Sequence, residues 1–287
     1  MRVSDTTDPY WNLAIEEWLL DRAADAEPIL YLWQSTPAVI IGKNQNPWRE
    51  CNLRWMKERC VRLARRVSGG GAVYHDEGNL NYAFFMPRTA YRADAVFALI
   101  GDVLADFGFA TERMKRTSLV VDGLKVSGNA FCFRRNAALH HGTLLVDSDL
   151  AALDHALRPS AWTFETRAKE SVRARVRNLS TAANPLTVQQ VREAFIARGA
   201  AGDVEGPSPD ELAQRIARLQ SDEWLFQKTP PFRARLQGEN EHFIEVEGER
   251  GMIKGVKCRV GTMQESLNRR WCGRLFDPDA LSAPFDA

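Results

Sequence analysis

Two arginines followed by three glycines are the residues of this chain best suited to chemistry. Residues 65–85 read RRVSGGGAVYHDEGNLNYAFF, so Arg66 stands just before the glycine run 69–71. Glycine lets backbone amides approach a ligand closely, and successive amides in such a turn can form a concave anion site. Arginine adds a planar, permanently charged fork that suits phosphate or carboxylate. The stretch predicts a site for a nucleotide phosphate, a carboxylate or both.

A lysine inside a β-rich run is the second feature. Residues 124–130 read LKVSGNA, which places Lys125 between two apolar residues. One interpretation is that Lys125 blocks edge-to-edge pairing of a strand. The other is that its ammonium points into a pocket, where the small Gly128 and Ala130 leave room for a ligand. Beside a glycine loop the second interpretation gains, because lysine is a good point charge for a phosphate and a carboxylate together.

The histidine pair at 140–141 is followed by a glycine. Adjacent residues of a strand point to opposite faces, so His140 and His141 cannot easily bind one metal ion. We therefore predict no protein-only metal site. We expect one imidazole to face the ligand cavity, and Gly142 to permit close approach.

Cys132 follows Ala130 by two positions and shares its predicted strand face. It could form a thioester if a nearby histidine activated it. A small buried hydrophobic residue is the commoner role of a free cysteine, and we favour that role here.

The composition is ordinary for a folded protein and excludes several classes of function. The 287 residues are 45% hydrophobic and 26% charged, with a net charge of +1, so no global field attracts nucleic acid. The five scattered cysteines favour a reducing compartment. No run of residues is apolar enough to suggest a membrane span, and no leader is visible. We expect a cytoplasmic protein, or a mitochondrial one if it is eukaryotic and its leader has been removed.

Hydrophobic periodicity and turn residues predict the elements that must position these side chains. The predicted helices are 10–20, 48–60, 94–107, 150–157, 187–198, 210–219 and 263–271. The predicted strands are 29–33, 38–42, 61–64, 72–75, 80–86, 118–121, 124–126, 130–134 and 139–146, with further strands within 232–260. We expect 72–75 and 80–86 to form a hairpin around 76–79, Asp149 to cap a helix, and 160–180 to be largely a mobile loop.

These elements predict an α/β (α+β) fold with a mixed sheet and two domains. Residues 1–200 would form a catalytic domain that binds the ligand. Residues 208–287 would form a small α+β accessory domain. The Gly-, Ala-, Asp- and Pro-containing stretch 199–209 is the predicted linker between them.

Four strings, in this order and at these separations, resemble the lipoate–protein ligase A family: RRVSGGGAVYHDEGNLNYAFF, GLKVSGNA, HHGTLLVD and KESVRARVRNL. The early segment PILYLWQSTPAVIIGKNQNPWRECNL is similar to the lipoyltransferase branch of the same family. The resemblance implies a biotin/lipoate-ligase-type catalytic domain with a class II synthetase-like architecture. It also implies a two-step reaction. Lipoate and ATP give lipoyl-AMP, and the lipoyl group then passes to a lysine of a lipoyl domain.

The resemblance implies site residues as well. Lys125 would be catalytic and would contact both nucleotide and lipoate. The implied contacts to ATP or the adenylate are Arg66, Gly69, Gly70, Gly71, Ala72, Val73, Tyr74, Asn79 and Lys125. The implied contacts to lipoate are His75, Lys125, Gly128, Ala130, His141 and Gly142.

The chemistry that this implies needs positioning and charge neutralisation more than a covalent intermediate. Lys125 would hold the two anionic reactants together, and Mg²⁺ would shield the leaving pyrophosphate. The Arg-rich stretch 167–178 is the predicted lid over the site. An apolar slot for the acyl chain is assigned to Val39, Ile41, Leu80 and Tyr82.

Several alternatives stay open from the sequence. The chain could be a lipoyltransferase that uses lipoyl-AMP or a lipoylated protein as donor, or an octanoyltransferase that works through Cys132. It could bind lipoate or an adenylate without turnover, or ligate biotin. The expected partners are lipoyl domains of 2-oxoacid dehydrogenase E2 subunits and the glycine-cleavage H protein, with no nucleic acid and no membrane, and the expected state is a monomer.

Overall fold

The computed structural model describes residues 2–158, 160–198, 206–238, 241–259 and 264–282. Its helices are α1 (Pro9–Arg22), α2 (Pro47–Glu50), α3 (Leu53–Glu58), α4 (Ala93–Ala105), α5 (Leu150–Ala156), α6 (Val188–Arg198), α7 (Pro209–Gln220), α8 (Asp222–Leu225), α9 (Gln264–Trp271) and α10 (Pro278–Ser282). Its strands are β1 (Arg2–Val3), β2 (Ile29–Trp33), β3 (Ala38–Ile41), β4 (Arg62–Arg65), β5 (Val73–His75), β6 (Asn79–Pro87), β7 (Glu112–Met114), β8 (Ser118–Val121), β9 (Leu124–Phe133), β10 (Ala137–Leu145), β11 (Thr163–Thr166), β12 (Phe232–Gln237), β13 (Phe243–Glu249) and β14 (Met252–Cys258).

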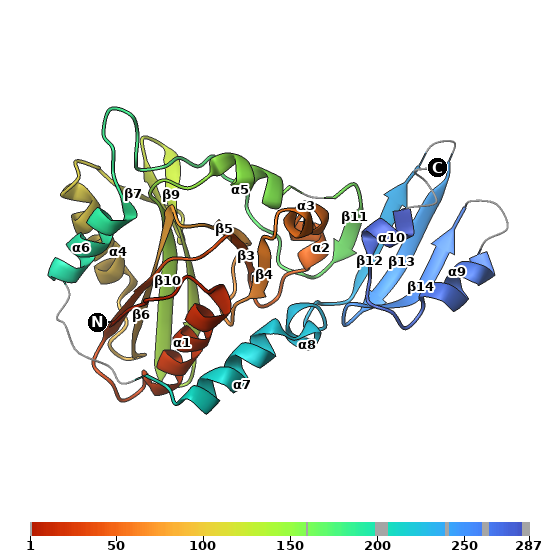
Figure 1. The fold of residues 1–287 in the computed structure, drawn as a ribbon, viewed down its shortest axis with the longest axis horizontal. Helices are drawn as coiled ribbons and strands as arrows, with labels where there is room; N and C mark the ends of the chain where they lie inside the picture. The colour runs from red at the N-terminus through yellow and green to blue at the C-terminus, as the bar shows by residue number, and fades with distance from the viewer. Residues whose placement is uncertain (1, 159, 199–205, 239–240, 260–263, 283–287) are drawn as a thin grey trace.

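A seven-stranded mixed sheet of order β1-β2-β6-β10-β9-β8-β7 is the centre of the molecule. Its central strands bury side chains on both faces. Along β6, Tyr82 and Phe84 pack with α4 and α6, whereas Ala83 and Phe85 pack with α1 and α7. Figure 1 shows α4 and α6 on one side of this sheet and α1 and α7 on the other. The sheet is therefore the middle layer, and the main cavity lies on the side of α1.

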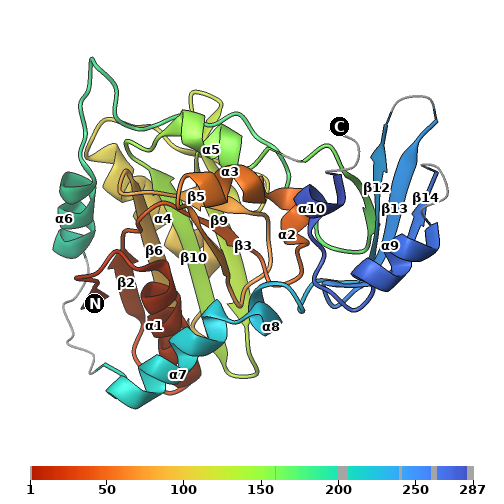
Figure 2. The same ribbon diagram turned by 45° about the vertical axis from the view of Figure 1, so that its right-hand side comes forward.

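A second, three-stranded sheet of order β4-β3-β5 lies over that side and carries the glycine loop (Figure 2). The predicted hairpin of 72–75 and 80–86 is wrong, because β5 pairs with β3 while β6 pairs with β2 and β10. The turn between these strands is fixed by Asp76, whose carboxylate accepts hydrogen bonds from the amides of Gly78 and Asp149. A β-carbon on Gly78 would lie 2.0 Å from the Asp147 carbonyl oxygen. The turn is thus fastened to the start of α5, and the chain crosses from one sheet to the other.

Other elements also differ from the prediction. The expected helix 48–60 is two helices, because Cys51 is extended and Asn52 caps a new start. The runs 124–126 and 130–134 are one strand, β9, that continues through Gly128. Within the predicted loop 160–180, β11 pairs with β12. Asp149 caps α5 as predicted.

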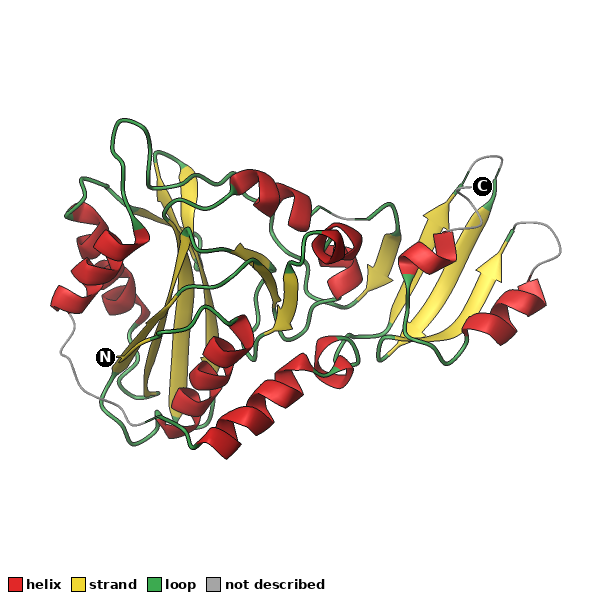
Figure 3. Ribbon diagram, in the orientation of Figure 1, coloured by secondary structure: helices red, strands yellow, loops and turns green. Residues whose placement is uncertain are grey.

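The four-stranded antiparallel sheet β11-β12-β13-β14 is a separate sheet, and Figure 3 shows it apart from the main sheet. Trp48 from α2, Trp162 and Phe276 pack on it. Although α7 follows the predicted linker, it packs on α1. The stretch 199–205 lies outside the described residues. The division into domains 1–200 and 208–287 stays a prediction. No helix in the described ranges combines the length and apolar character that a membrane crossing needs.

Candidate ligand-binding site

A cavity of about 330 Å³ opens between the main sheet and the glycine loop. Its walls come from β9 and β10 below, from the loop and β5 above, and from the segment 169–174 across the mouth. Most of the residues predicted for the site line this cavity: Arg66, Gly70, Gly71, Ala72, Val73, His75, Lys125, Gly128, Ala130, His141 and Gly142. Three predicted residues, Gly69, Tyr74 and Asn79, are not part of the lining.

The glycine loop needs its glycines for two different reasons. Gly70 has φ +93°, a conformation that side chains with a β-carbon rarely adopt. A β-carbon on Gly71 would lie 3.0 Å from the Ser171 hydroxyl. That hydroxyl accepts from the Ala72 amide at 2.9 Å. The loop is therefore tightly turned at Gly70 and covered by 169–174 at Gly71.

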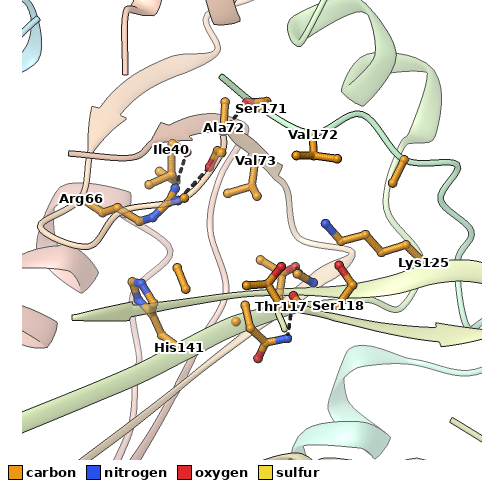
Figure 4. A pocket seen from close by; sticks show the side chains of 18 of the residues that line it. Ile40, Arg66, Ala72, Val73, Thr117, Ser118, Lys125, His141, Ser171 and Val172 are labelled. Carbon is orange, nitrogen blue, oxygen red and sulfur yellow. Dashed lines mark hydrogen bonds between the residues drawn. The ribbon is translucent and has the colours of Figure 1, made fainter. Parts of the chain in front are cut away.

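Arg66 holds this loop in shape. Its guanidinium donates to the carbonyl oxygens of Ile40, Gly69 and Gly71, at 2.9, 2.7 and 2.7 Å, and to the Ser68 hydroxyl at 3.0 Å. The side chain is buried, and burial lowers its pKa to about 10. Figure 4 shows the guanidinium directed at the loop above the cavity. Most of its N–H groups bond to the protein itself, so Arg66 fixes the shape of the glycine loop as well as lining the cavity.

Arg65 also uses its guanidinium to fix backbone, and the sequence analysis did not assign it a role. Its guanidinium is fully buried and donates to the carbonyl oxygens of Gly42, Lys43, Gln45 and Leu225 and to the Thr229 hydroxyl. The Trp224 indole N–H donates a 2.7 Å hydrogen bond to the Arg65 carbonyl oxygen. These contacts tie the strand that leads into the glycine loop to α8.

A β-bulge aims Lys125 into the cavity. The register between β8 and β9 slips between Leu119 and Val120, which leaves Val126 as the extra residue. Bulges redirect side chains. Here Val126 joins the core on the α4 side, while Lys125 lies above Gly128 on the cavity side. Figure 4 shows its ammonium directed into the space below Val73 and Val172. Burial, and then the Arg66 charge, lower the pKa of Lys125.

The segment 169–174 closes the mouth, and the residues after it pair with the lysine strand. The Lys125 amide donates to the Arg175 carbonyl oxygen at 3.0 Å, and the Arg177 amide donates to the Lys125 carbonyl oxygen at 3.1 Å. The predicted lid 167–178 therefore includes the residues that cover the cavity. Its cationic side chains Lys169 and Arg173 lie on the cavity wall.

The two histidines diverge as predicted. His140 points to the α4 side, where it contacts Phe97 and Phe131. His141 faces the cavity and bonds Glu16 Oε2 at 2.7 Å and Ser68 Oγ at 2.6 Å. Sequence reasoning missed both of its partners, which come from a helix and from the glycine loop. The Glu16–His141–Ser68 chain fixes the imidazole at the inner end of the cavity.

The apolar slot was assigned to the wrong residues. Val39 and Ile41 face the cluster around α2 and α3, and Leu80 and Tyr82 face the α4 side. Strand alternation puts their neighbours on the cavity side instead. The apolar lining at the inner end is Leu13, Trp33, Ile40 and Val73.

Cys132 is half-buried on β9 and packs beside the core on the α1 side. It is not part of the cavity lining. Burial raises the pKa of its thiol, which opposes thiolate formation. Both observations fit the packing role that we favoured.

Comparison with known proteins gives the family and the fold. The model of the lipoyl protein ligase A/B catalytic domain matches residues 8–199. Lipoate-protein ligase A of Bdellovibrio bacteriovorus is 34% identical over 303 residues, covering 97% of this chain and 89% of that protein. The structure of Plasmodium falciparum LipL1 in complex with lipoate has a TM-score of 0.66 and 26% identity, covering 90% of this chain and 83% of that one.

An archaeal structure shows the same fold. It is the bi-partite lipoate protein ligase of Thermoplasma acidophilum, studied with its E2 lipoyl domain. It superposes with a TM-score of 0.64 at 23% identity, covering 78% of this chain and 94% of that one.

Proposed function

The chain belongs to the lipoyl protein ligase A/B catalytic-domain family, and we propose that it activates free lipoate with ATP and transfers the lipoyl group to a lysine of a lipoyl domain. Lipoate ligation is the activity for which the 34% identical Bdellovibrio protein is named. The order of the two steps, the donor and the acceptor are the parts that this proposal adds.

One observation carries the proposal: the Lys125 ammonium lies inside the cavity, above Gly128, facing the glycine loop (Figure 4). The cavity wall also carries Lys115, Lys169 and Arg173. Its carboxylates are Glu170 and Glu16, and Glu16 is engaged by His141 and the Trp33 indole. The cavity therefore presents an excess of positive charge, which suits two anionic reactants.

In the first step the lipoate carboxylate oxygen attacks the α-phosphorus of ATP, and the bond from that phosphorus to the pyrophosphate oxygen breaks. Lys125 would hold the carboxylate beside the phosphate against their mutual repulsion. Backbone amides of the glycine loop would face the phosphate oxygens. Such a reaction depends on positioning and charge neutralisation. The segment 169–174 would keep water from the mixed anhydride.

Mg²⁺ would enter with the triphosphate. The described residues hold no group of three His, Cys, Asp or Glu side chains that could bind a metal ion. We therefore propose that the triphosphate and water supply most of the oxygens that Mg²⁺ requires. When bound, it would neutralise charge on the leaving pyrophosphate.

In the second step the amine of an acceptor lysine attacks the acyl carbon of lipoyl-AMP, an amide forms and AMP leaves. The Thermoplasma ligase is paired with an E2 lipoyl domain, which supports lipoyl domains of E2 subunits, and by extension the glycine-cleavage H protein, as acceptors. Cationic side chains at the mouth, such as Lys115 and Arg173, would favour an acidic acceptor surface. A cytoplasmic monomer remains our expectation.

The donor is identified by offering three candidate donors in separate reactions. Purified protein receives an apo lipoyl domain with lipoate plus ATP and Mg²⁺, with lipoyl-AMP, or with lipoylated H protein, and mass spectrometry counts modified domain. Modification from lipoate plus ATP and Mg²⁺, lost when ATP is omitted, is the expected result. Modification from lipoyl-AMP or lipoylated protein alone would instead assign a transferase.

Lys125→Ala is the matched variant. Removing one charge contact of this kind costs about a hundredfold in rate, so pyrophosphate release should fall by that factor while transfer from added lipoyl-AMP falls less. Near-normal pyrophosphate release from the variant would refute the role of Lys125.

A further inference from the structure

One carboxylate at the mouth of the cavity has no ion-pair partner among the described residues. Glu170 lies in the segment 169–174, lines the cavity and is exposed. None of the ion pairs between described residues, at a limit of 4.0 Å, includes it. The charged side chains that share the cavity wall with it are mostly basic, namely Arg66, Lys115, Lys125, Lys169 and Arg173. Glu170 is thus an unpaired anion in a cationic opening.

The backbone on either side of Glu170 is fixed. The Lys169 amide donates to the Asn44 carbonyl oxygen at 2.9 Å, and the Ser171 amide donates to Glu50 Oε2 at 3.1 Å. The Ser171 hydroxyl also bonds an amide of the glycine loop. An exposed carboxylate is therefore carried on a backbone that is held beside this loop, where the acyl-adenylate would lie.

The second step of the proposed reaction needs a proton acceptor. A lysine arrives mostly as an ammonium, because its usual pKa is about 10.4. The basic wall disfavours that charge and so favours the neutral amine. As the amine nitrogen attacks the acyl carbon, the N–C bond forms, and the bond from that carbon to the phosphate oxygen breaks. AMP leaves with the electron pair of the broken bond, and the nitrogen must lose one proton to become an amide nitrogen.

The other groups on the described cavity wall that can accept a proton are already engaged. Glu16 accepts hydrogen bonds at both carboxylate oxygens, and His141 is bonded at both ring nitrogens. His75 is only 3% exposed, and burial lowers its pKa to about 3, so it is a poor base. Lys125 keeps its proton while it contacts the phosphate, because a neighbouring anion favours the charged form. Glu170 is the group that remains.

We propose that Glu170 accepts the proton that the acceptor lysine loses as its amide forms. This inference rests on the proposed function, because it takes the second step to be attack by lysine on lipoyl-AMP. The carboxylate accepts a hydrogen bond from the amine, stabilises the positive charge that develops on the attacking nitrogen, and then takes the proton. It returns the proton to water after the product has left. Glu170 has no part in the first step, in which no amine reacts.

The test separates the two half-reactions in the full-length protein. Pyrophosphate release from lipoate and ATP with Mg²⁺ measures the first step. Mass spectrometry of an apo lipoyl domain, supplied with lipoyl-AMP, measures the second. Glu170→Gln should lower kcat for transfer by about a hundredfold, the smaller of the usual effects of a general base, while pyrophosphate release stays near the wild-type rate.

Two further measurements distinguish a base from a merely structural residue. Glu170→Asp keeps a carboxylate and should recover part of the transfer rate. The loss in Glu170→Gln should shrink as the pH rises toward the usual pKa of lysine, because hydroxide then removes the proton. Glu165→Gln is the control, since it removes the same charge from an exposed residue of β11 that does not line the cavity. It should leave both half-reactions unchanged.

Three results would overturn the inference or the function beneath it. Equal losses in both half-reactions of Glu170→Gln would make Glu170 a support for the segment 169–174. An unchanged kcat for transfer, even with a raised KM for the lipoyl domain, would leave it no role as a base. If the wild type transfers from lipoyl-AMP but releases no pyrophosphate, the proposed activation step fails, and the Glu170 variants still decide this inference. A wild type that uses neither donor overturns both.

Discussion

The ammonium nitrogen of Lys125 lies 3.0 Å from the point that a β-carbon on Gly128 would occupy. Only the bulge in β9 brings these two residues together, because strict alternation would put them on opposite faces. The small residue is therefore needed by the lysine side chain, and its φ is not in the left-handed region.

Gly128→Ala should displace the ammonium without unfolding the protein, because the atoms it meets are the far end of a flexible side chain. A displacement of about 1 Å can cost up to a hundredfold in rate, so we expect pyrophosphate release to fall by about tenfold. Gly255→Ala, which meets nothing within 4 Å, is the control. Equal rates for the two variants would contradict this arrangement.

Adjacent glycines of the loop should respond differently to alanine. Gly70 has φ +93°, and a β-carbon there would lie 2.9 Å from Arg66 Nη2, whereas Gly69 has open space around it. Gly70→Ala should strain the loop by about 1–2 kcal/mol and raise the KM for ATP by about tenfold, while Gly69→Ala stays near the wild type. Steady-state kinetics with ATP as the varied substrate measures both. Equal increases in KM would show that the loop conformation is not the cause.

Arg65 lies next to the glycine loop, and we expect it to contribute mainly to stability. Arg65→Met would leave several buried carbonyl oxygens without a donor, and we expect the free energy of unfolding to fall by about 3 kcal/mol or more. Urea denaturation measures the change. Arg54→Met, which removes an exposed ion pair with Glu58, should change stability by less than about 1 kcal/mol. Comparable losses of stability in both variants would contradict the role given to the Arg65 hydrogen bonds that join β4 to α8.

Two buried histidines should make stability depend on acid pH. Burial is the largest cause that lowers the pKa of His75 and of His140 from 6.5 to about 3. The unfolded chain therefore binds protons at pH values where the folded chain does not. Their stabilisation is complete above pH 6.5 and is lost as the pH falls from 6.5 toward 3, with a limiting slope of about 1.4 kcal/mol per pH unit for each histidine.

Replacing one histidine should reduce that slope. His75→Phe should remove about half of the pH dependence between about pH 6.5 and 4, whatever its effect on stability at neutral pH. The exposed His242 is the control, and His242→Gln should leave the slope unchanged. Chemical denaturation at a series of pH values gives the slopes directly, and an unaltered slope in His75→Phe would refute a neutral buried ring.

Local patterns were enough to predict much of the fold. Hydrophobic periodicity predicted α1, α4 and α7, and the cap at Asp149 was visible in the sequence. Alternation predicted that His140 and His141 diverge. Periodicity failed where partners had to be chosen, since β5 and β6 are consecutive strands that join different sheets. Two caps, Asn46 and Asn52, were the available signal that the helix predicted at 48–60 is broken.

By itself the sequence determined the chemistry that is present: a glycine turn with arginine, one lysine in a strand and a divergent histidine pair, because residue type and short spacing are local properties. Only the tertiary structure decided where these groups act. The bulge at Val126 aims Lys125 at the cavity. Long-range contacts join the Arg66 guanidinium to the Ile40 carbonyl oxygen and Glu16 to His141, and leave His75 and Asn81 unpartnered. Those outcomes depend on which strands and helices meet, and a choice of partner across many residues has no local pattern that could predict it.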